Sequence, residues 1–269
     1  MVIESRQNRQ VKELFSLKTN KGRRKLNQYY VEGIKIVFES LKIPDRVTKI
    51  FYRDGFGATI DEKKMLDQVE KLNIESITLN SDLFNEMSDT QESQGVLAVV
   101  TKENWDLNKL LGEVKEKSTL LILDRIQDPG NMGTIIRTAE AFGVSGIILC
   151  KGSVDPYNSK VIRSTMGSVL RMPLVFSNDI SLEIELLKNE KFDVLVTSLD
   201  ANKNLDKMSF DNRNVLVIGN EANGVSEEIQ STSDKLLKIP MIGKSESLNA
   251  AIATSIVLYD LQTKVFLSN

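Results

Sequence analysis

LILDRIQDPGNMGTIIRTAEAFG, residues 121–143, is the stretch from which we predict the fold of this chain. The apolar run Leu120–Leu123 ends abruptly at Asp124, which is typical of a strand buried on both faces of a sheet. Asp128-Pro129-Gly130 is a turn signal, and Asn131 then suits the N-cap of a helix. The helix carries an apolar stripe at helical spacing, made of Met132, Ile135, Ile136, Ala139 and Phe142. The stretch therefore predicts a buried strand, a loop and an amphipathic helix.

The polar side chains of this helix form a ridge beside the carboxyl end of the strand, with Asn131, Thr134 and Arg137 at every third position. Three further apolar runs, 193–197, 215–218 and 236–239, predict strands that each end in small or polar residues. Parallel strands whose loops gather at their carboxyl ends form a ligand-binding crevice there. We therefore predict an α/β domain with a parallel sheet, in which Arg137 is the first candidate for chemistry.

The residue types that the chain lacks narrow this chemistry. There is no histidine, which excludes Ser-His and Cys-His nucleophilic pairs and imidazole catalysis, and we expect no metal site. Cys150, the single cysteine, closes an apolar run and fits a buried strand residue in a reducing cytoplasm. No apolar run reaches the roughly 18 residues that span a bilayer, and the N-terminus is no signal peptide. We therefore expect a cytoplasmic protein without a membrane partner.

Charge is distributed unevenly along the chain. Residues 1–49 hold twelve Lys or Arg against five Asp or Glu, a net charge of +7, whereas the whole chain carries −2 and the remainder therefore −9. A basic N-terminal segment on an otherwise acidic protein indicates attraction to a polyanion such as nucleic acid. The alternative from charge alone is a solvated basic helix.

The sequence lacks the usual phosphate-binding motifs. No Gly-x-Gly-x-x-Gly follows a predicted strand and no Gly-x-x-x-x-Gly-Lys-Ser/Thr occurs, so a Rossmann dehydrogenase and a P-loop NTPase fit poorly. The run GNEANG, residues 219–224, has neither spacing. Several adjoining loops could instead hold an adenosine without a phosphate-binding turn. S-adenosylmethionine, which lacks phosphates, suits that arrangement.

Three stretches resemble, in order, the three signatures of the SpoU (TrmH-like) family of RNA 2'-O-ribose methyltransferases: DPGNMGTIIRTAEAFGV (128–144), VIGNEANGV (217–225) and IPMIGKSESLNAAIA (239–253). The resemblance implies S-adenosylmethionine-dependent methyl transfer to a ribose 2'-hydroxyl of ribosomal or transfer RNA. It also implies a SPOUT α/β domain with a C-terminal trefoil knot. The family works as a homodimer joined through the knotted regions, so a homodimer is expected here.

The resemblance further implies an active-site set consisting of Arg137, Asn131, Glu221, Ser247 and Asn249. Arginine stays protonated in proteins, so we hypothesise that Arg137 clamps a neighbouring phosphate and polarises the hydroxyl, while the proton leaves through phosphate or water. The alternative is a surface pair between Arg137 and Glu140. Glu221 would either anchor Arg137 or order its own loop.

The cofactor site that the resemblance implies is built from residues that follow three of the predicted strands: Thr197, Ser198, Leu199, Gly219, Ile239, Met241, Ser247, Leu248 and Asn249. Backbone groups would recognise the adenine, and Ile239 and Leu248 would supply apolar contact. For these two residues ordinary core packing is the alternative.

Residues 1–101 alternate between predicted strands and helices, which indicates a small α/β domain of its own. We place a linker at 102–116 and the methyltransferase domain at 117–269. YYVEG (29–33) and QGVLAVV (94–100) resemble the L30e/L7Ae-like substrate-binding domain found in the family. A basic loop at 21–25 and a helix at 155–166 supply the RNA contacts that we expect, namely Lys21, Arg23, Arg24, Lys25, Arg163 and Ser164.

Two other functions are compatible with this pattern. A non-catalytic RNA-binding protein could keep the methyltransferase fold without turnover, and the absence of S-adenosylmethionine binding would identify it. A methyltransferase of small molecules or proteins is disfavoured by the basic N-terminal segment.

Overall fold

The computed structural model describes residues 2–90, 92–199, 201–244 and 246–267. The chain divides into two compact units. The first consists of Met1–Glu103 and Tyr157–Leu170, and the second of Asn104–Pro156 and Arg171–Asn269. The segment 157–170 lies within our predicted methyltransferase domain in sequence, yet it belongs to the first unit.

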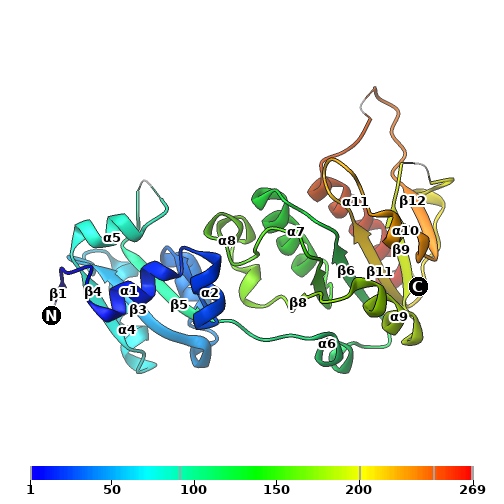
Figure 1. Cartoon of the computed structure of the whole chain (residues 1–269). Coiled ribbons are helices and arrows are strands. Elements are labelled where there is room, and N and C mark those ends of the chain that lie inside the picture. Colours follow the sequence, from blue (N-terminus) through cyan, green and yellow to red (C-terminus); the bar gives the residue numbers. More distant parts are fainter. Residues whose placement is uncertain (1, 91, 200, 245, 268–269) are drawn as a thin grey trace. The chain divides into compact units, whose positions relative to one another are not determined.

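The first unit is a mixed sheet with helices (Figure 1). Its strands, in the spatial order β1-β4-β3-β5-β2, are β1 (Val2–Ile3), β2 (Gln28–Glu32), β3 (Val47–Arg53), β4 (Ser76–Leu79) and β5 (Val96–Thr101). Its helices are α1 (Arg9–Ser16), α2 (Asn20–Leu26), α3 (Ile34–Ser40), α4 (Ile60–Lys71), α5 (Ser81–Met87) and α8 (Ser159–Thr165). β4 pairs in parallel with β1 and β3, and β5 pairs antiparallel with β2 and β3. The predicted small α/β domain is present.

The predicted basic loop at 21–25 is wrong, because these residues form most of α2. Thr19 caps the helix by accepting a hydrogen bond from Gly22 N–H. α2 lies so close to α1 that a Cβ atom on Gly22 would come within 2.0 Å of the Ser16 carbonyl oxygen. Gly22 therefore lies at a close contact between two helices, where glycine is favoured even though it lowers the helix propensity.

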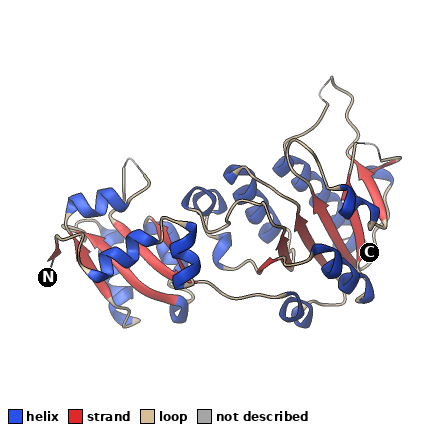
Figure 2. Cartoon of the chain, viewed as in Figure 1, coloured by secondary structure: helices blue, strands red, loops and turns tan. Residues whose placement is uncertain are grey.

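The second unit contains a parallel sheet that joins seven strands of the described chain, in the order β10-β12-β9-β11-β6-β7-β8 (Figure 2). The strands are β6 (Ser118–Leu123), β7 (Gly146–Leu149), β8 (Leu174–Phe176), β9 (Asp193–Thr197), β10 (Lys203–Asn204), β11 (Arg213–Ile218) and β12 (Lys235–Lys238). The helices are α6 (Leu107–Glu113), α7 (Pro129–Ala141), α9 (Ile180–Asn189), α10 (Glu227–Ser231) and α11 (Ala250–Gln262). The predicted parallel α/β fold is confirmed, and the predicted strands at 193–197, 215–218 and 236–239 correspond to β9, β11 and β12.

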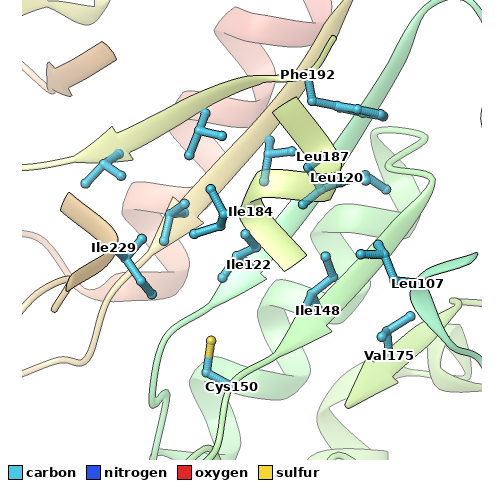
Figure 3. Close-up of a cluster of buried hydrophobic side chains, with 14 of the residues drawn as sticks. Leu107, Leu120, Ile122, Ile148, Cys150, Val175, Ile184, Leu187, Phe192 and Ile229 are labelled. Atoms are coloured by element: carbon cyan, nitrogen blue, oxygen red, sulfur yellow. The ribbon is translucent and has the colours of Figure 1, made fainter. Parts of the chain in front are cut away.

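Two layers of helices cover this sheet. On one face Leu120 and Ile122 of β6 pack with Ile184 of α9 and Ile229 of α10 in one apolar cluster (Figure 3). The alternate residues of β6 point to the opposite face, where α7 and α11 pack against each other. Leu120–Leu123 are fully buried, as the continuous apolar run predicted.

The predicted linker at 102–116 is wrong in part, because it contains α6. Leu107 and Leu110 of this helix are buried in the core of the second unit, and Trp105 packs against the same cluster. Asp106 caps the helix by accepting a hydrogen bond from Lys109 N–H. The polar composition of the segment hid an amphipathic helix with a narrow apolar stripe.

α11 is the last α-helix of the described chain. It begins after Asn249, and only one side of it is buried, with Val257, Leu258 and Leu261 fully covered. Together with the helical turn at 263–267 it forms an 18-residue stretch, Ala250–Leu267, that is long and apolar enough to cross a membrane by length and composition alone. Our statement that no run reaches this length was therefore too strict. The same test is passed by core helices of soluble proteins, and α11 packs on α7.

Candidate active site

The predicted site lies where the strand order of the second unit reverses. β6 is flanked by β7 on one side and by β11 on the other, so the chain leaves β6 in one direction and later returns beside it. Ile218 at the end of β11 pairs in register with Leu123 at the end of β6. The loops after these two strands therefore meet at the carboxyl edge, which is the usual ligand-binding position of such sheets.

The loop after β6 leads directly into α7. Asp128 is the N-cap, since its side chain accepts a hydrogen bond from Asn131 N–H at 2.8 Å, and Pro129 occupies the first helical position. The prediction of Asn131 as N-cap is wrong by three residues. Because Asp128 caps the helix, the Asn131 side chain is not needed as a cap and can contact other loops.

Three of the predicted active-site residues form a hydrogen-bonded chain. Asn131 Nδ2 donates to Glu221 Oε1 at 3.0 Å, and Asn249 Nδ2 donates to Asn131 Oδ1 at 2.8 Å. Asn249 Oδ1 also accepts from Ala251 N–H at 2.9 Å and so caps α11. One side chain from each of the three sequence signatures thus joins the others, although they lie 90 and 118 residues apart.

Glu221 orders the loop in front of α7. Its two carboxylate oxygens accept hydrogen bonds from Gln127 N–H and Asp128 N–H, each at 3.3 Å. Burial by itself raises the pKa of Glu221, but the hydrogen bonds from Asn131 and the loop backbone outweigh it and hold the pKa below its ordinary value of 4.5. Of the two roles that the sequence left open for Glu221, its observed contacts are those of loop ordering.

The loop that carries Glu221 is held by its neighbours. Asn220 Oδ1 accepts hydrogen bonds from Ala222 N–H and Asn223 N–H, and its amide donates to the Arg125 carbonyl at 2.9 Å. A Cβ atom on Gly219 would lie 2.1 Å from the backbone of Gly224 and Val225, so the loop closes on itself only with glycine there. Asn223 lies within this turn.

Arg137 lies six residues after Asn131 on α7, and it is exposed. Among the residues that the structure describes, its side chain makes no hydrogen bond and no ion pair. The alternative of a surface pair with Glu140 is not observed, because Glu140 instead accepts from Arg171 Nε at 2.7 Å. The guanidinium of Arg137 is therefore open to a ligand.

The predicted cofactor residues lie after adjacent strands of the same edge. Thr197 ends β9, Gly219 follows β11, and Ile239 and Met241 follow β12; all four are partly buried. Leu199 and Leu248 are exposed to 61% and 36%, and Ser247 is exposed as well. Ser198 N–H donates to the Leu237 carbonyl at 3.0 Å, which ties the loop after β9 to β12. β9, β11 and β12 thus place Thr197, Gly219 and Ile239 at the carboxyl edge of the sheet.

The predicted RNA contacts differ in exposure. Lys21, Arg24 and Lys25 are exposed on α2, at the spacing of one helix face. Arg23 is wrong as an RNA contact, because it is buried and donates to the carbonyls of Leu17 and Lys18 beyond the end of α1. Basic composition alone cannot distinguish an arginine that caps a neighbouring helix from one that faces solvent.

Arg163 and Ser164 lie on α8 in the first unit rather than in the second. Arg163 is exposed, whereas the Ser164 hydroxyl donates to the Lys160 carbonyl one turn earlier. Cys150 follows β7 and is buried, and burial raises the pKa of its thiol to about 12. In the described part of the chain, no group of three or more Cys, Asp or Glu side chains is placed to hold a metal ion.

Sequence reasoning missed two polar residues that hold the edge together. Asp124 is buried and accepts from Ser226 N–H at 2.8 Å and from Arg125 Nε at 2.9 Å, which links the loops after β6 and β11. Asn220 makes the second link. A carboxylate at the end of a fully apolar strand was a visible signal for Asp124, because a buried charge requires partners.

The chain matches two family models, one in each of the predicted domains. Residues 118–259 match the model of the SpoU rRNA Methylase family. Residues 8–98 match the model of an MRM3-like substrate binding domain.

Several known proteins are similar over the full length. The 23S rRNA (guanosine(2553)-2'-O)-methyltransferase RlmP of Bacillus subtilis is 34% identical over 97% of this chain and 98% of its own. The crystal structure of the SpoU methyltransferase AviRb from Streptomyces viridochromogenes, in complex with AdoMet, superimposes with a TM-score of 0.88 at 25% identity, covering 98% and 100% of the two chains. The AdoMet-bound rRNA methyltransferase from Sinorhizobium meliloti gives a TM-score of 0.83 at 27% identity, covering 100% and 99%.

Proposed function

Since this chain belongs to the SpoU rRNA Methylase family and is an S-adenosylmethionine-dependent RNA 2'-O-methyltransferase, we propose that its substrate is 23S ribosomal RNA. The reaction joins a methyl group to the ribose 2'-oxygen of one nucleotide. The relative that supports this choice of RNA is RlmP, which is similar over nearly the whole of both chains.

The observation that carries the proposed site is the hydrogen-bonded chain Glu221–Asn131–Asn249, together with the open side chain of Arg137 on the same helix as Asn131. It unites the three signature loops at the reversal point of the sheet. The side chains of the chain are fixed by one another, whereas Arg137 retains all of its donors. A fixed platform with one open cation suits a substrate that carries negative charge.

The residues at this edge fit S-adenosylmethionine. The exposed apolar side chains of Leu199 and Leu248 and the partly buried Ile239 suit the faces of an adenine, and the hydroxyl groups of Thr197 and Ser247 suit its polar edges and ribose. None of the residues proposed for this pocket is a lysine or an arginine, which matches a ligand without phosphates. When bound, S-adenosylmethionine supplies an electrophilic methyl group on a sulfonium.

We assign Arg137 to the substrate side of this reaction. Its guanidinium would hold the phosphate next to the target ribose and polarise the 2'-hydroxyl, while the proton leaves through that phosphate or water, because arginine is a poor proton acceptor. Asn131 and Asn249 would fix the start of α7 and α11, and Glu221 the loop before α7. Positioning of this kind supplies on the order of 7–11 kcal/mol of the barrier.

The first unit is the proposed RNA-binding part of the protein, as the substrate-binding family match supports. The exposed face formed by Lys21, Arg24 and Lys25 of α2 would bind phosphates without regard to sequence. Binding of these side chains releases counterions from the RNA. This release is less favourable at high salt, so the affinity for RNA falls as the salt concentration is raised. We also propose a cytoplasmic location, where its RNA would be found and where the buried thiol of Cys150 stays reduced.

A homodimer through α11 is proposed from the exposed apolar side of that helix. Ile252, Ile256 and Tyr259 are exposed to 53%, 38% and 62% and share one helix face. An apolar stripe of this kind on a soluble protein marks an interaction surface. Sedimentation equilibrium should give twice the chain mass for the wild type and the chain mass for the Ile252→Asp/Ile256→Asp variant; a monomeric wild type would contradict the dimer.

The RNA assignment is tested by incubating the purified protein and S-adenosylmethionine with unmodified 23S rRNA and, separately, with unmodified tRNA. We expect one 2'-O-methylated nucleotide in 23S rRNA, detected by mass spectrometry of nuclease fragments, and none in tRNA. Methylation of tRNA alone would overturn the choice of RNA, and the absence of methylation from both would favour a non-catalytic RNA-binding protein.

A further inference from the structure

The first unit contains a pocket of about 280 Å³, and of its lining residues only Arg163 has been considered above, as an expected RNA contact. It is lined by the turn between β2 and α3, by Gln94 before β5, and by α8. Its apolar lining comes from Ile36, Ile162 and Met166. All the residues that line it belong to the first unit, and none of them is in the proposed active-site or cofactor set.

The polar side of the pocket is held in place by hydrogen bonds. The Glu32 carboxylate accepts from the hydroxyls of Ser88, Thr90 and Ser93, which orders the loop in front of β5. Gln94 Oε1 accepts from Ile34 N–H at 2.8 Å. The Gln94 amide group is thereby fixed, and its Nε2 donor has no partner among the described residues.

Two cations border the pocket. Lys35 and Arg163 line it and are exposed, and in the described part of the chain neither side chain makes a hydrogen bond or an ion pair. They come from α3 and α8, so two separate elements direct positive charge to one opening. An apolar cavity with one amide donor and two open cations fits a ligand that combines a flat ring with an anion.

Met166 has an unfavourable backbone for its side chain. It ends α8 with φ of +51°, in the left-handed region that glycine and asparagine adopt most readily, and its side chain is 51% exposed. Asparagine or glycine would end the helix with less strain. The methionine instead places a flexible, polarisable apolar group at the pocket, a side chain well suited to contact with a ring.

We propose that this pocket binds one unstacked nucleotide of the RNA substrate, other than the nucleotide that is methylated. The base contacts Ile36, Ile162 and Met166 and accepts a hydrogen bond from Gln94, while Lys35 and Arg163 bind its phosphate. Recognition of a base outside a helix is the usual way in which proteins select an RNA by sequence. The pocket would thus contribute to the choice of RNA, and this inference rests on the proposed RNA substrate.

The Met166→Asn variant of the full-length protein tests the proposal. Asparagine tolerates the left-handed backbone, so the thermal transition should be at least as high as that of the wild type. The affinity for a 23S rRNA fragment that contains the methylated nucleotide, measured by fluorescence anisotropy, should fall about tenfold, because contact with a base is lost. Ile60→Asn, which removes another exposed apolar side chain of the same unit, is the control and should leave the affinity unchanged.

A second variant addresses the phosphate. Lys35→Gln/Arg163→Gln should weaken RNA binding and reduce the slope of log Kd against log salt by about one to two, whereas Lys160→Gln, which changes an exposed cation of α8 outside the pocket lining, should not. If both pocket variants bind RNA as tightly as the wild type, the proposed nucleotide pocket is overturned. Methylation of 23S rRNA by the wild type would still support the proposed function. RNA binding that depends on Met166 without any methylation would overturn the proposed function and retain the pocket.

Discussion

At the amino end of the parallel sheet two lysines are paired with carboxylates, whereas Arg137, on the helix that follows the carboxyl end of β6, has no partner among the described residues. Lys235 at the start of β12 bonds to Asp193 and, at 3.2 Å, to Asp211. Lys188 pairs with Asp234 at 2.8 Å. The carboxyl end also has an ion pair, between Asp124 and Arg125, but its three signature loops are joined by the neutral amides of Asn131 and Asn249 and the carboxylate of Glu221, which leave Arg137 open.

The difference shows how one sheet separates stability from chemistry. The charged groups of these amino-end ion pairs already have partners, so a ligand would gain little free energy by binding to them. At the carboxyl end the amide chain keeps the loops in place without neutralising Arg137. The account therefore predicts that equivalent substitutions at the two ends affect different measurements.

The largest effect is expected from Arg137→Ala. Loss of the cation that holds the phosphate and polarises the hydroxyl should lower kcat by at least about a hundredfold, while the Kd for S-adenosylmethionine stays within about twofold. Arg213→Ala is the control, because Arg213 lies at the amino end of β11 and donates to the Glu190 carbonyl. Equal losses of turnover in both variants would show that the two ends do not differ as proposed.

A smaller loss is expected when the hydrogen-bonded chain is cut. Glu221→Gln keeps the shape of the side chain but replaces an acceptor of backbone N–H groups from Gln127 and Asp128 by an amide. Misplacement of the loop before α7 should reduce kcat about ten- to a hundredfold. Single-turnover methylation would measure it; an unchanged rate would mean that the loop is fixed by other contacts.

Substitution at the amino end should affect stability alone. Lys235→Met keeps the aliphatic stem but leaves the partly buried Asp193 without its cation, which should lower the free energy of unfolding by about 1–3 kcal/mol. Urea denaturation measures the change, and kcat should remain within about twofold. If Lys235→Met instead lowers kcat strongly without loss of stability, the amino end of the sheet takes part in the reaction and the proposal is contradicted.

The smallest expected effect is a change in the free energy of unfolding at low pH. The pKa of Glu221 is lowered in the folded protein, so the carboxylate contributes stability that is present above its ordinary value of 4.5 and is lost as pH falls through the lower, folded value. The stability difference between the wild type and Glu221→Gln should therefore shrink as pH falls below about 4.5. Urea midpoints at pH values on either side test this, and a constant difference would contradict it.

The carboxyl end could be largely predicted because its signals are local. The apolar run of β6, the Asp-Pro turn and the helical stripe of α7 each depend on neighbouring residues, and all three are present. The assignment of the N-cap was the exception. Both Asp128 and Asn131 favour that position, and Pro129 is the local signal that distinguishes them, because proline favours the first helical position after the N-cap.

Features that depend on tertiary partners could not be predicted. Arg23 is buried because the carbonyl groups of Leu17 and Lys18, which follow α1, accept its hydrogen bonds. α6 is recognisable only once Leu107 and Leu110 have a sheet to cover. The assignment of 157–170 to the first unit has no local signal either. The chain Glu221–Asn131–Asn249 likewise depends on the order of the strands, which periodicity does not determine.

The position of the transferred methyl group tests the central claim most directly. The wild type and Arg137→Ala are each incubated with unmodified 23S rRNA and S-adenosylmethionine labelled in the methyl group, and the RNA is then hydrolysed with alkali. Alkali cleaves RNA through a free 2'-hydroxyl, so a 2'-O-methylated nucleotide survives in a dinucleotide. We predict that the wild type places the label in one alkali-resistant dinucleotide and that Arg137→Ala yields almost none; label on a base, or undiminished label with Arg137→Ala, would contradict the account.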